Sequence, residues 1–447
     1  MKTKSLLTGL LTLGLACGSI VGPRATHAAS TVTLTWLTRT DPVVNPWEDA
    51  TIKSFEALHP TIQIQQVKVP TASYDQKMLT MIAGGSPPDV FSHWGSNSWA
   101  DLVYRGVAAD LTPYINASHF SFEGMPASLR NLYTIKGHVY GIPFASGGSF
   151  LFYNVDLLKK ARLATPPTDW NDKSWNWATV LRYAQAMNKA SGSLSNRVFG
   201  LYDNLWPPNA NAMLWGGDIF PQSAYATGVV DRVQATSAPV RQATQWQADQ
   251  IFKYKIGPTP SQATSLSTAA DPFLSGRIGL EMTGVWGFWV FQPATFKWAA
   301  APLPYIKTDK DVVFTDPWIM AKKSAHPQEA WTFLEYLSDP RYGGKTYMAA
   351  TGVVPPFSQL LPGWAAGVHT HVPSLSVAQL TQLANGSMAH GQESINHLAI
   401  NYGQYDSVIA NVLTPVWTGR ETSSAALAQL QQQLTSTIQR AGISGGR

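Results

Sequence analysis

The sequence predicts an α/β protein built from two lobes. Its 447 residues exceed the size of about 250–300 residues at which one hydrophobic core stops growing, so two cores are expected. After residue 30, short apolar strands alternate with helical patterns, which is typical of parallel sheets with crossover helices. Hydrophobic residues make up 45% of the chain and charged residues 13%, a balance that indicates a globular chain and not a disordered one.

The N-terminal region carries the first strand–helix alternation. Asn45 is expected to cap a helix with Pro46 in its first position, and Pro60 ends that helix. Ser73 is expected to cap a second helix, which stops at Gly84. Alternating or continuous apolar residues predict three strands around these helices, over residues 32–36, 62–69 and 89–92.

The alternation continues to the end of the chain. Two strands, 140–143 and 150–153, are predicted to flank a loop of small residues at 146–149. A Ser/Thr/Pro-rich stretch covers residues 258–271. Three later helices are predicted: one from near Trp177, one over 328–337, and a last one between a cap at Thr422 or Ser423 and a stop at Gly442.

The first 30 residues have the pattern of an export signal. Two lysines lie among the first four residues, an apolar run follows, and a small-residue cleavage site ends at Ala28. Alternatively, Cys17 carries a lipid, because the preceding residues are close to a lipoprotein leader, although Gly14 stands where leucine is usual. Cleavage near Ala28 and lipid attachment at Cys17 both stay open. Either predicts an exported protein, extracellular or periplasmic, at the cell surface if it is lipid-anchored.

Several classes of chemistry have no support in the sequence. Lysines and arginines are scattered singly or in pairs, so the net charge of +5 does not indicate a nucleic-acid partner. Cys17 is the one cysteine, which leaves no thiol or disulfide chemistry after the leader. His369 and His371 would share one face of a strand, but no carboxylate or cysteine lies near them in sequence. We therefore expect no catalytic residue, no metal site and no cofactor.

A series of short strings resembles the extracellular solute-binding proteins of bacterial ABC importers, family 1, the carbohydrate-binding proteins similar to maltose-binding protein. The most recognisable string is AGGSPPDVF at residues 83–91. The strings follow the family's order from about residue 30 to the C-terminus. The others lie at residues 55–60, 62–64, 140–143, 151–158, 166–170, 214–220, 276–279, 284–286, 329–334 and 352–355.

The resemblance implies two Rossmann-like lobes joined by a hinge, with a ligand cleft between them, as in the type 2 periplasmic-binding-protein fold. The first lobe would comprise residues 31–143 plus 312–354, and the second 144–311 plus 355–447. It also implies a carbohydrate ligand, permease subunits of an ABC transporter as partners, and a monomer that captures its ligand without chemistry.

Position in the chain selects the candidate ligand-binding residues. Ligands of open α/β sheets bind at the carboxyl ends of strands, and small residues just after a crossing allow close backbone approach. Trp286 is the foremost candidate, because Gly284 and Gly287 beside it leave a ring exposed to a cleft. The full set of candidates is Arg39, Asp41, Trp94, Ser146, Gly147, Trp206, Trp286, Asp316 and Trp318.

The composition suits a neutral sugar. Sugars present apolar C–H faces to aromatic rings and hydroxyls to polar side chains, and the chain has 17 Trp, 16 Tyr and 17 Phe. Relatives often have glycines where this chain has residues 314–318, so the ligand is expected to differ from the commoner disaccharides. Two alternatives stay open. A cluster of cleft Arg or Lys would favour a phosphorylated polyol such as a glycerol phosphate ester, and two facing carboxylates a secreted glycoside hydrolase.

Overall fold

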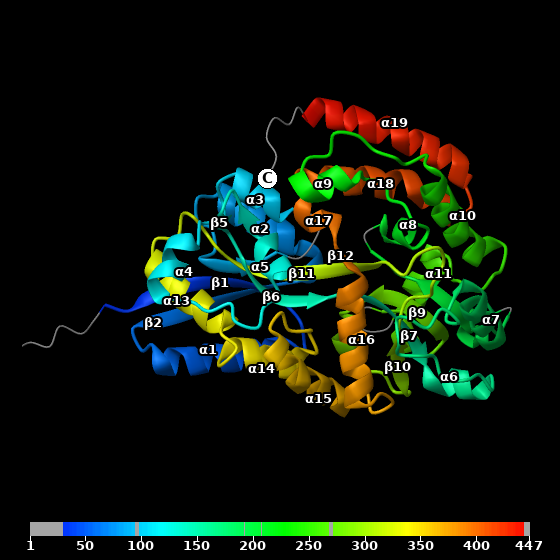
Figure 1. Ribbon diagram of the computed structural model, residues 1–447, viewed down its shortest axis with the longest axis horizontal. Helices are drawn as coiled ribbons and strands as arrows, with labels where there is room; N and C mark the ends of the chain where they lie inside the picture. The colour runs from blue at the N-terminus through cyan, green and yellow to red at the C-terminus, as the bar shows by residue number, and fades with distance from the viewer. Residues whose placement is uncertain (1–29, 94–97, 192, 207, 268–270, 442–447) are drawn as a thin grey trace, which may run out of the picture.

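The computed structural model describes residues 30–441, except 94–97, 192, 207 and 268–270. The leader with Cys17 and Ala28, the candidate Trp94 and the predicted stop Gly442 lie outside the described residues. Two larger sheets lie side by side, each flanked by helices, which gives the two-lobed α/β fold that the sequence predicted (Figure 1). Among the described residues, no helix has both the length and the apolar character that a bilayer crossing requires.

The first lobe is built on a six-stranded sheet with the order β12-β11-β3-β1-β2, in which β6 also pairs with β11. β1 runs parallel to β2 and β3, whereas β11 is antiparallel to β3 and β6. The strands are β1 (Val32–Arg39), β2 (Ile62–Val69), β3 (Val90–Ser92), β6 (Ile142–Gly147), β11 (Asp311–Met320) and β12 (Gly391–Glu393). The three predicted N-terminal strands are thereby confirmed.

The second lobe is built on a four-stranded sheet with the order β10-β7-β9-β8. Only β8 and β9 are parallel; β7 pairs antiparallel with β9 and β10. Every residue of β7, β9 and β10 is buried, including the polar residues Ser149, Asn154, Glu281 and Thr283. The strands are β7 (Ser149–Asn154), β8 (Phe199–Asp203), β9 (Ile278–Gly284) and β10 (Trp298–Ala301), and a separate hairpin pairs β4 (Thr134–Ile135) with β5 (His138–Val139).

Helices cover both sheets. α1 and α14 lie below the first sheet in Figure 1, and α2 and α3 above it. The helices as far as β9 are α1 (Asn45–Leu58), α2 (Tyr74–Ala83), α3 (Trp99–Tyr104), α4 (Thr112–Ser118), α5 (Ala127–Leu132), α6 (Val155–Lys160), α7 (Trp177–Met187), α8 (Ala210–Leu214), α9 (Gln222–Thr227), α10 (Ala238–Phe252) and α11 (Pro260–Leu266). The later ones are α12 (Gly287–Val290), α13 (Pro327–Ser338), α14 (Gly343–Thr351), α15 (Leu361–His371), α16 (Val377–His390), α17 (Ile395–Leu398), α18 (Tyr402–Trp417) and α19 (Ser423–Ala441), and 3-10 turns lie at Thr71–Ser73, Leu194–Asn196, Phe273–Ser275 and Ser358–Leu360.

Three local predictions were wrong. The turn before α1 is capped by Asp41, whose carboxylate accepts from the amides of Val43 (2.8 Å) and Val44 (3.1 Å), and not by Asn45. The predicted loop at 146–149 is almost entirely strand, because β6 and β7 are separated by Gly148 alone. His369 and His371 lie on α15, so they do not share a strand face.

A buried carboxylate joins the segments that cross between the sheets. Asp311, at the start of β11, accepts from the amide of Ser149 (2.9 and 3.1 Å) and from Ser387 Oγ on α16 (2.7 Å). The same residue pairs with Gly391 of β12. β6–β7, β11 and the α16–β12 segment therefore meet at one side chain. The lobe boundaries given above stay predictions; β12 joins the first sheet, although its residues fall in the range expected for the second lobe.

Asp311 is expected to make the protein less stable as the pH rises. Burial raises the pKa of its carboxyl to about 8, far above its usual value. A group whose pKa is raised on folding stabilises the fold fully at low pH, and that contribution is lost as the pH rises through the folded-state pKa. Urea melts of Asp311→Asn should therefore depend less on pH between about 4 and 8 than wild-type melts. Parallel dependences would show that Asp311 is ionised over this range.

A cavity lined by both lobes

A cavity of about 140 Å³ lies between the two sheets. The first sheet contributes side chains from the end of β1, from β6 and from β11; the second contributes the segments that follow β8 and β9. α17 lines a further wall. Five of the nine candidates predicted from the sequence lie around this one space: Arg39, Ser146, Trp206, Trp286 and Asp316.

Aromatic rings form the apolar side of the cavity. Trp286 lies two residues after the end of β9, and its ring lies over Gly284, where a β-carbon would overlap it. Phe314 of β11 lies between the two tryptophans: its ring centroid is 5.1 Å from that of Trp286 and 5.9 Å from that of Trp206, on which it stacks. Trp289 of α12 also lines the space. Rings from both lobes therefore meet in the cavity.

A charged network forms the polar side. His397 of α17 is buried; its Nδ1 lies 2.5 Å from Glu393 Oε1 and its Nε2 3.6 Å from Asp316 Oδ1. Burial raises the pKa of Asp316 to about 6, against the opposing charges of His397 and Arg39. For His397, burial is outweighed by the hydrogen bond and charge of Glu393 and the charge of Asp316, so its pKa is raised. The cavity thus offers an imidazole, a carboxyl and a guanidinium side by side.

Three candidates among the described residues do not line the cavity: Asp41, Gly147 and Trp318. Trp318 is 2% exposed and stacks on Phe144 with a centroid distance of 4.0 Å, so its ring belongs to the core of the first lobe. Asp41 borders, with Trp318 and Arg39, a separate space of about 10 Å³, enough for a single water. Its carboxylate already caps the turn before α1.

Ser146 and Gly147, at the end of β6 where the chain passes from the first sheet to the second, are tightly packed. The Ser146 hydroxyl lies 3.0 Å from Thr315 Oγ1, so its hydrogen-bonding capacity is partly used within the first sheet. A β-carbon on Gly147 would come within 2.7 Å of Val285 Cγ2, which shows how closely β6 approaches the cavity wall. Glycine is needed at this position for close packing.

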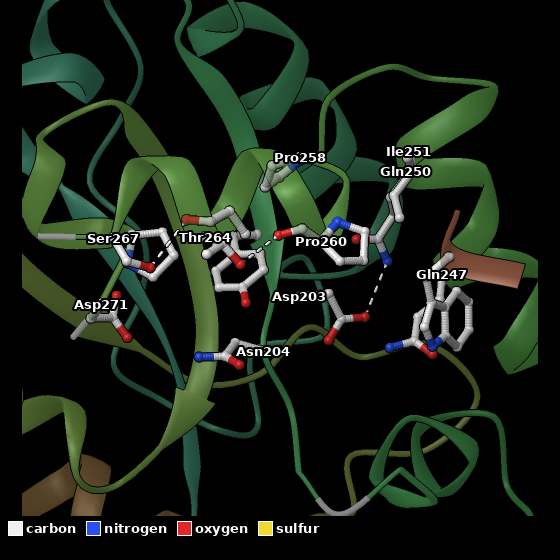
Figure 2. A pocket seen from close by; sticks show the side chains of 15 residues that line it. Asp203, Asn204, Gln247, Gln250, Ile251, Pro258, Pro260, Thr264, Ser267 and Asp271 are labelled. Carbon is white, nitrogen blue, oxygen red and sulfur yellow. Dashed lines mark hydrogen bonds between the residues drawn. The ribbon is translucent and has the colours of Figure 1, made fainter. Parts of the chain in front are cut away.

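Sequence reasoning missed Phe314, Asn396 and His397, all of which line the cavity. Glu393 ends β12 and His397 lies on the short helix α17 that follows, and nothing in the local sequence indicates that these two elements pack against β11. A larger cavity of about 430 Å³ lies elsewhere, beside the end of β8 (Figure 2). Its walls come from β8, α10, α11 and the end of α18. Of these two cavities, the first alone is lined, among the described residues, by strands of the first sheet together with segments that follow strands of the second. It is therefore the candidate site for a ligand held between lobes.

A family model described as bacterial extracellular solute-binding protein matches residues 38–343. The chain belongs to this family. Members of the family are binding proteins. This solute-binding protein is 26% identical over 301 residues to a putative binding protein of Brucella abortus, an alignment that covers 65% of this chain and 68% of its relative. It is 24% identical to the lactose-binding protein of Rhizobium radiobacter, over 63% of this chain and 64% of the relative.

Solved structures show the same fold. An ABC substrate-binding protein from Listeria monocytogenes, solved in complex with cycloalternan, matches with a TM-score of 0.78. The match covers 92% of this solute-binding protein and 100% of the other chain at 20% sequence identity. The predicted family and the predicted two-lobed fold are both confirmed.

Proposed function

We propose that this protein captures a sugar or oligosaccharide between its lobes and delivers it to the permease of an ABC importer. The observation that carries the proposal is the pairing in one cavity of Trp206, Trp286 and Phe314 with Asp316 and His397. Aromatic faces suit the C–H faces of a sugar, and the polar groups suit its hydroxyls. The lactose-binding relative and the cycloalternan complex support a carbohydrate ligand.

The charge of the cavity favours a neutral ligand over a phosphorylated polyol. Among the described residues that line it, Arg39 is the one arginine or lysine. Asp316 adds a carboxyl on the same side. A phosphate ester would need a cluster of cationic donors, and a nearby carboxylate would repel it.

The geometry also favours capture without chemistry. A glycosidase needs two carboxyl groups facing the sugar, separated by open space for the scissile bond or a water. Here Asp316 and Glu393 are both held by the ring of His397, which fills the space between them. We therefore propose that Asp316 hydrogen-bonds a hydroxyl and that the protein is not an enzyme. We propose further that it is exported, acts as a monomer and has the lobe boundaries given above.

Ligand binding is expected to stabilise and compact the mature protein. A thermal-shift screen against mono- and oligosaccharides should raise the melting temperature for the matching sugar, because that sugar binds the folded state alone. Small-angle scattering with that sugar should then show a smaller radius of gyration, since the lobes approach about the hinge. The bound sugar should be recovered intact by chromatography.

Distinct outcomes would contradict the separate parts of this proposal. A screen in which phosphate esters stabilise the protein and no neutral sugar does would replace the ligand class. An unchanged scattering profile at saturation would contradict closure. Shortening of the sugar that disappears in Asp316→Asn would show that the protein is a hydrolase.

A further inference from the structure

The larger cavity, beside the end of β8, has a lining unlike that of the cavity between the lobes. Asp203 and Asn204 enter it from the strand end, Gln247 and Gln250 from α10, and Asp271 from the segment before β9 (Figure 2). Its volume of about 430 Å³ lies within the range of small-molecule sites. The amides and carboxyls of these side chains face a common space.

A third carboxyl lies on the same side of the sheet. Tyr202 of β8 lines the cavity and is in register with Glu281 of β9. Neighbours in register point to the same face of a sheet, so Glu281 lies beside Tyr202. Asn204 Nδ2 donates to Glu281 Oε1 (3.1 Å). The carboxyl of Glu281 is fully buried and lies beside that of Asp271; burial and the charge of Asp271 raise the pKa of Glu281 well above its usual value. The charges of Glu281, Asp271 and Asp203 all act, after burial, to raise the pKa of Tyr202, which places the three carboxyls around one ring.

No cation balances these carboxyls. Among the described residues that line the cavity, none is lysine, arginine or histidine. The hydrogen bonds that Asp203 accepts from the described residues come from neutral groups: Gln250 Nε2 (3.4 Å), Asn211 Nδ2 (3.4 Å), the Leu205 amide (3.3 Å) and the side chain of Gln247. Burial raises the pKa of Asp203 to about 6, and no cationic side chain among the described lining residues offsets its charge when it is ionised.

The residues that line the cavity favour an organic cation over a metal ion as the partner of these carboxyls. Within the described residues, no group of three or more acidic, histidine or cysteine side chains is placed to hold a metal ion. Tyr202 and Trp417 add aromatic surface, which attracts organic cations through their ring faces. A compact ammonium group would donate to the carboxyls while its carbon skeleton packs on these rings.

We propose that this cavity is a second binding site, distinct from the cleft between the lobes, for a small organic ammonium ion. Asp203 and Asp271 accept from the ammonium group, and Tyr202 and Trp417 contact its carbon skeleton. The amides of Gln247 and Asn204 hydrogen-bond any polar substituent.

The test uses putrescine as the probe and 1,4-butanediol, its neutral counterpart of equal chain length, as the ligand control. Calorimetric titration of the mature protein at pH 7.5 should show saturable putrescine binding and no butanediol binding. Asp203→Asn should weaken putrescine binding by about 10- to 100-fold, because a charge-assisted hydrogen bond is lost. Asp249→Asn, on the same helix as Gln247 but outside the cavity lining, should bind putrescine like the wild type.

Melting curves of both variants check that they are folded, and Asp271→Asn replaces Asp203→Asn if the latter is unfolded. The proposal is overturned by the absence of saturable putrescine binding, by equal binding of butanediol, or by wild-type affinity in a folded Asp203→Asn or Asp271→Asn. Equal weakening in Asp249→Asn would overturn it as well, because the effect would then be one of net charge alone.

Discussion

Replacing Trp286 with alanine is expected to weaken sugar binding by about 30- to 150-fold and to leave the fold near its wild-type stability. The ring is half-buried at the cavity, so truncation removes an aromatic face that a sugar would contact. Aromatic contacts contribute about 0.5–1.5 kcal/mol beyond area burial, and burial of the ring face raises the total to about 2–3 kcal/mol. Truncating a core tryptophan would instead cost about 3–5 kcal/mol of folding free energy.

The matched control is Trp177→Ala. Trp177 is also half-buried, but its ring packs on Trp246, away from the cavity. Calorimetric titration and denaturant melts on both variants separate binding from folding. Near wild-type affinity in Trp286→Ala, together with a melt lowered by a core-sized amount, would show that the ring supports the fold and does not stack on the ligand.

Replacing Gly148 with alanine is expected to lower the free energy of unfolding by about 3 kcal/mol, because the new methyl group overpacks a buried site and breaks its hydrogen bonds. A β-carbon at Gly148 would overlap Asp311 Oδ2 and Ser387 Oγ, which are hydrogen-bonded to each other. Displacing them leaves the buried carboxyl short of a donor. Sugar affinity should fall as well, since the segments joined at Asp311 connect the lobes. Denaturant melts and titrations measure the two effects.

Gly363→Ala provides the control for Gly148→Ala. Gly363 lies on α15, and no heavy atom lies within 4 Å of an added β-carbon there. An added methyl in a helix stabilises it by about 0.5–1 kcal/mol when it meets no neighbour. Equal melts for Gly148→Ala and the wild type would show that the crossing accommodates a side chain, and that Asp311 does not hold these segments tightly.

Local pattern predicted most of the regular structure. β2 and α1 follow from apolar periodicity, because each has one face on the core, whereas β1 has a run of buried residues that face both sides of its sheet. The cap of α1 was assigned wrongly because Asp41 and Asn45 are both good capping residues four positions apart, and only the backbone path decides which side chain reaches the free amides.

The cavity was predicted in part. Arg39 was predicted because it lies at the end of a strand, where ligands bind in such sheets, and Trp286 because glycines on both sides leave its ring exposed; both line the cavity. Trp318 satisfied a similar rule, but β11 is covered on both faces, so its ring is buried against Phe144. His397 lines the cavity because α17 packs against β11, about 80 residues earlier in the sequence. Local sequence patterns do not predict contacts between segments so far apart.

A ligand that binds between Trp206 and Trp286 must replace the contacts that the ring of Phe314 makes with them. The ring of Phe314 contacts those of Trp206 and Trp286, the other two aromatic rings proposed to bind the sugar. Binding there breaks ring contacts that contribute about 0.5–1.5 kcal/mol each. The measured affinity for the ligand is therefore lower than it would be if the tryptophan rings had no contact with Phe314. Only a molecule with an apolar face of its own recovers this loss. Small polar solutes without an apolar face cannot replace the ring contacts of Phe314 and therefore bind weakly. The cleft thus discriminates against such solutes independently of its hydrogen bonds.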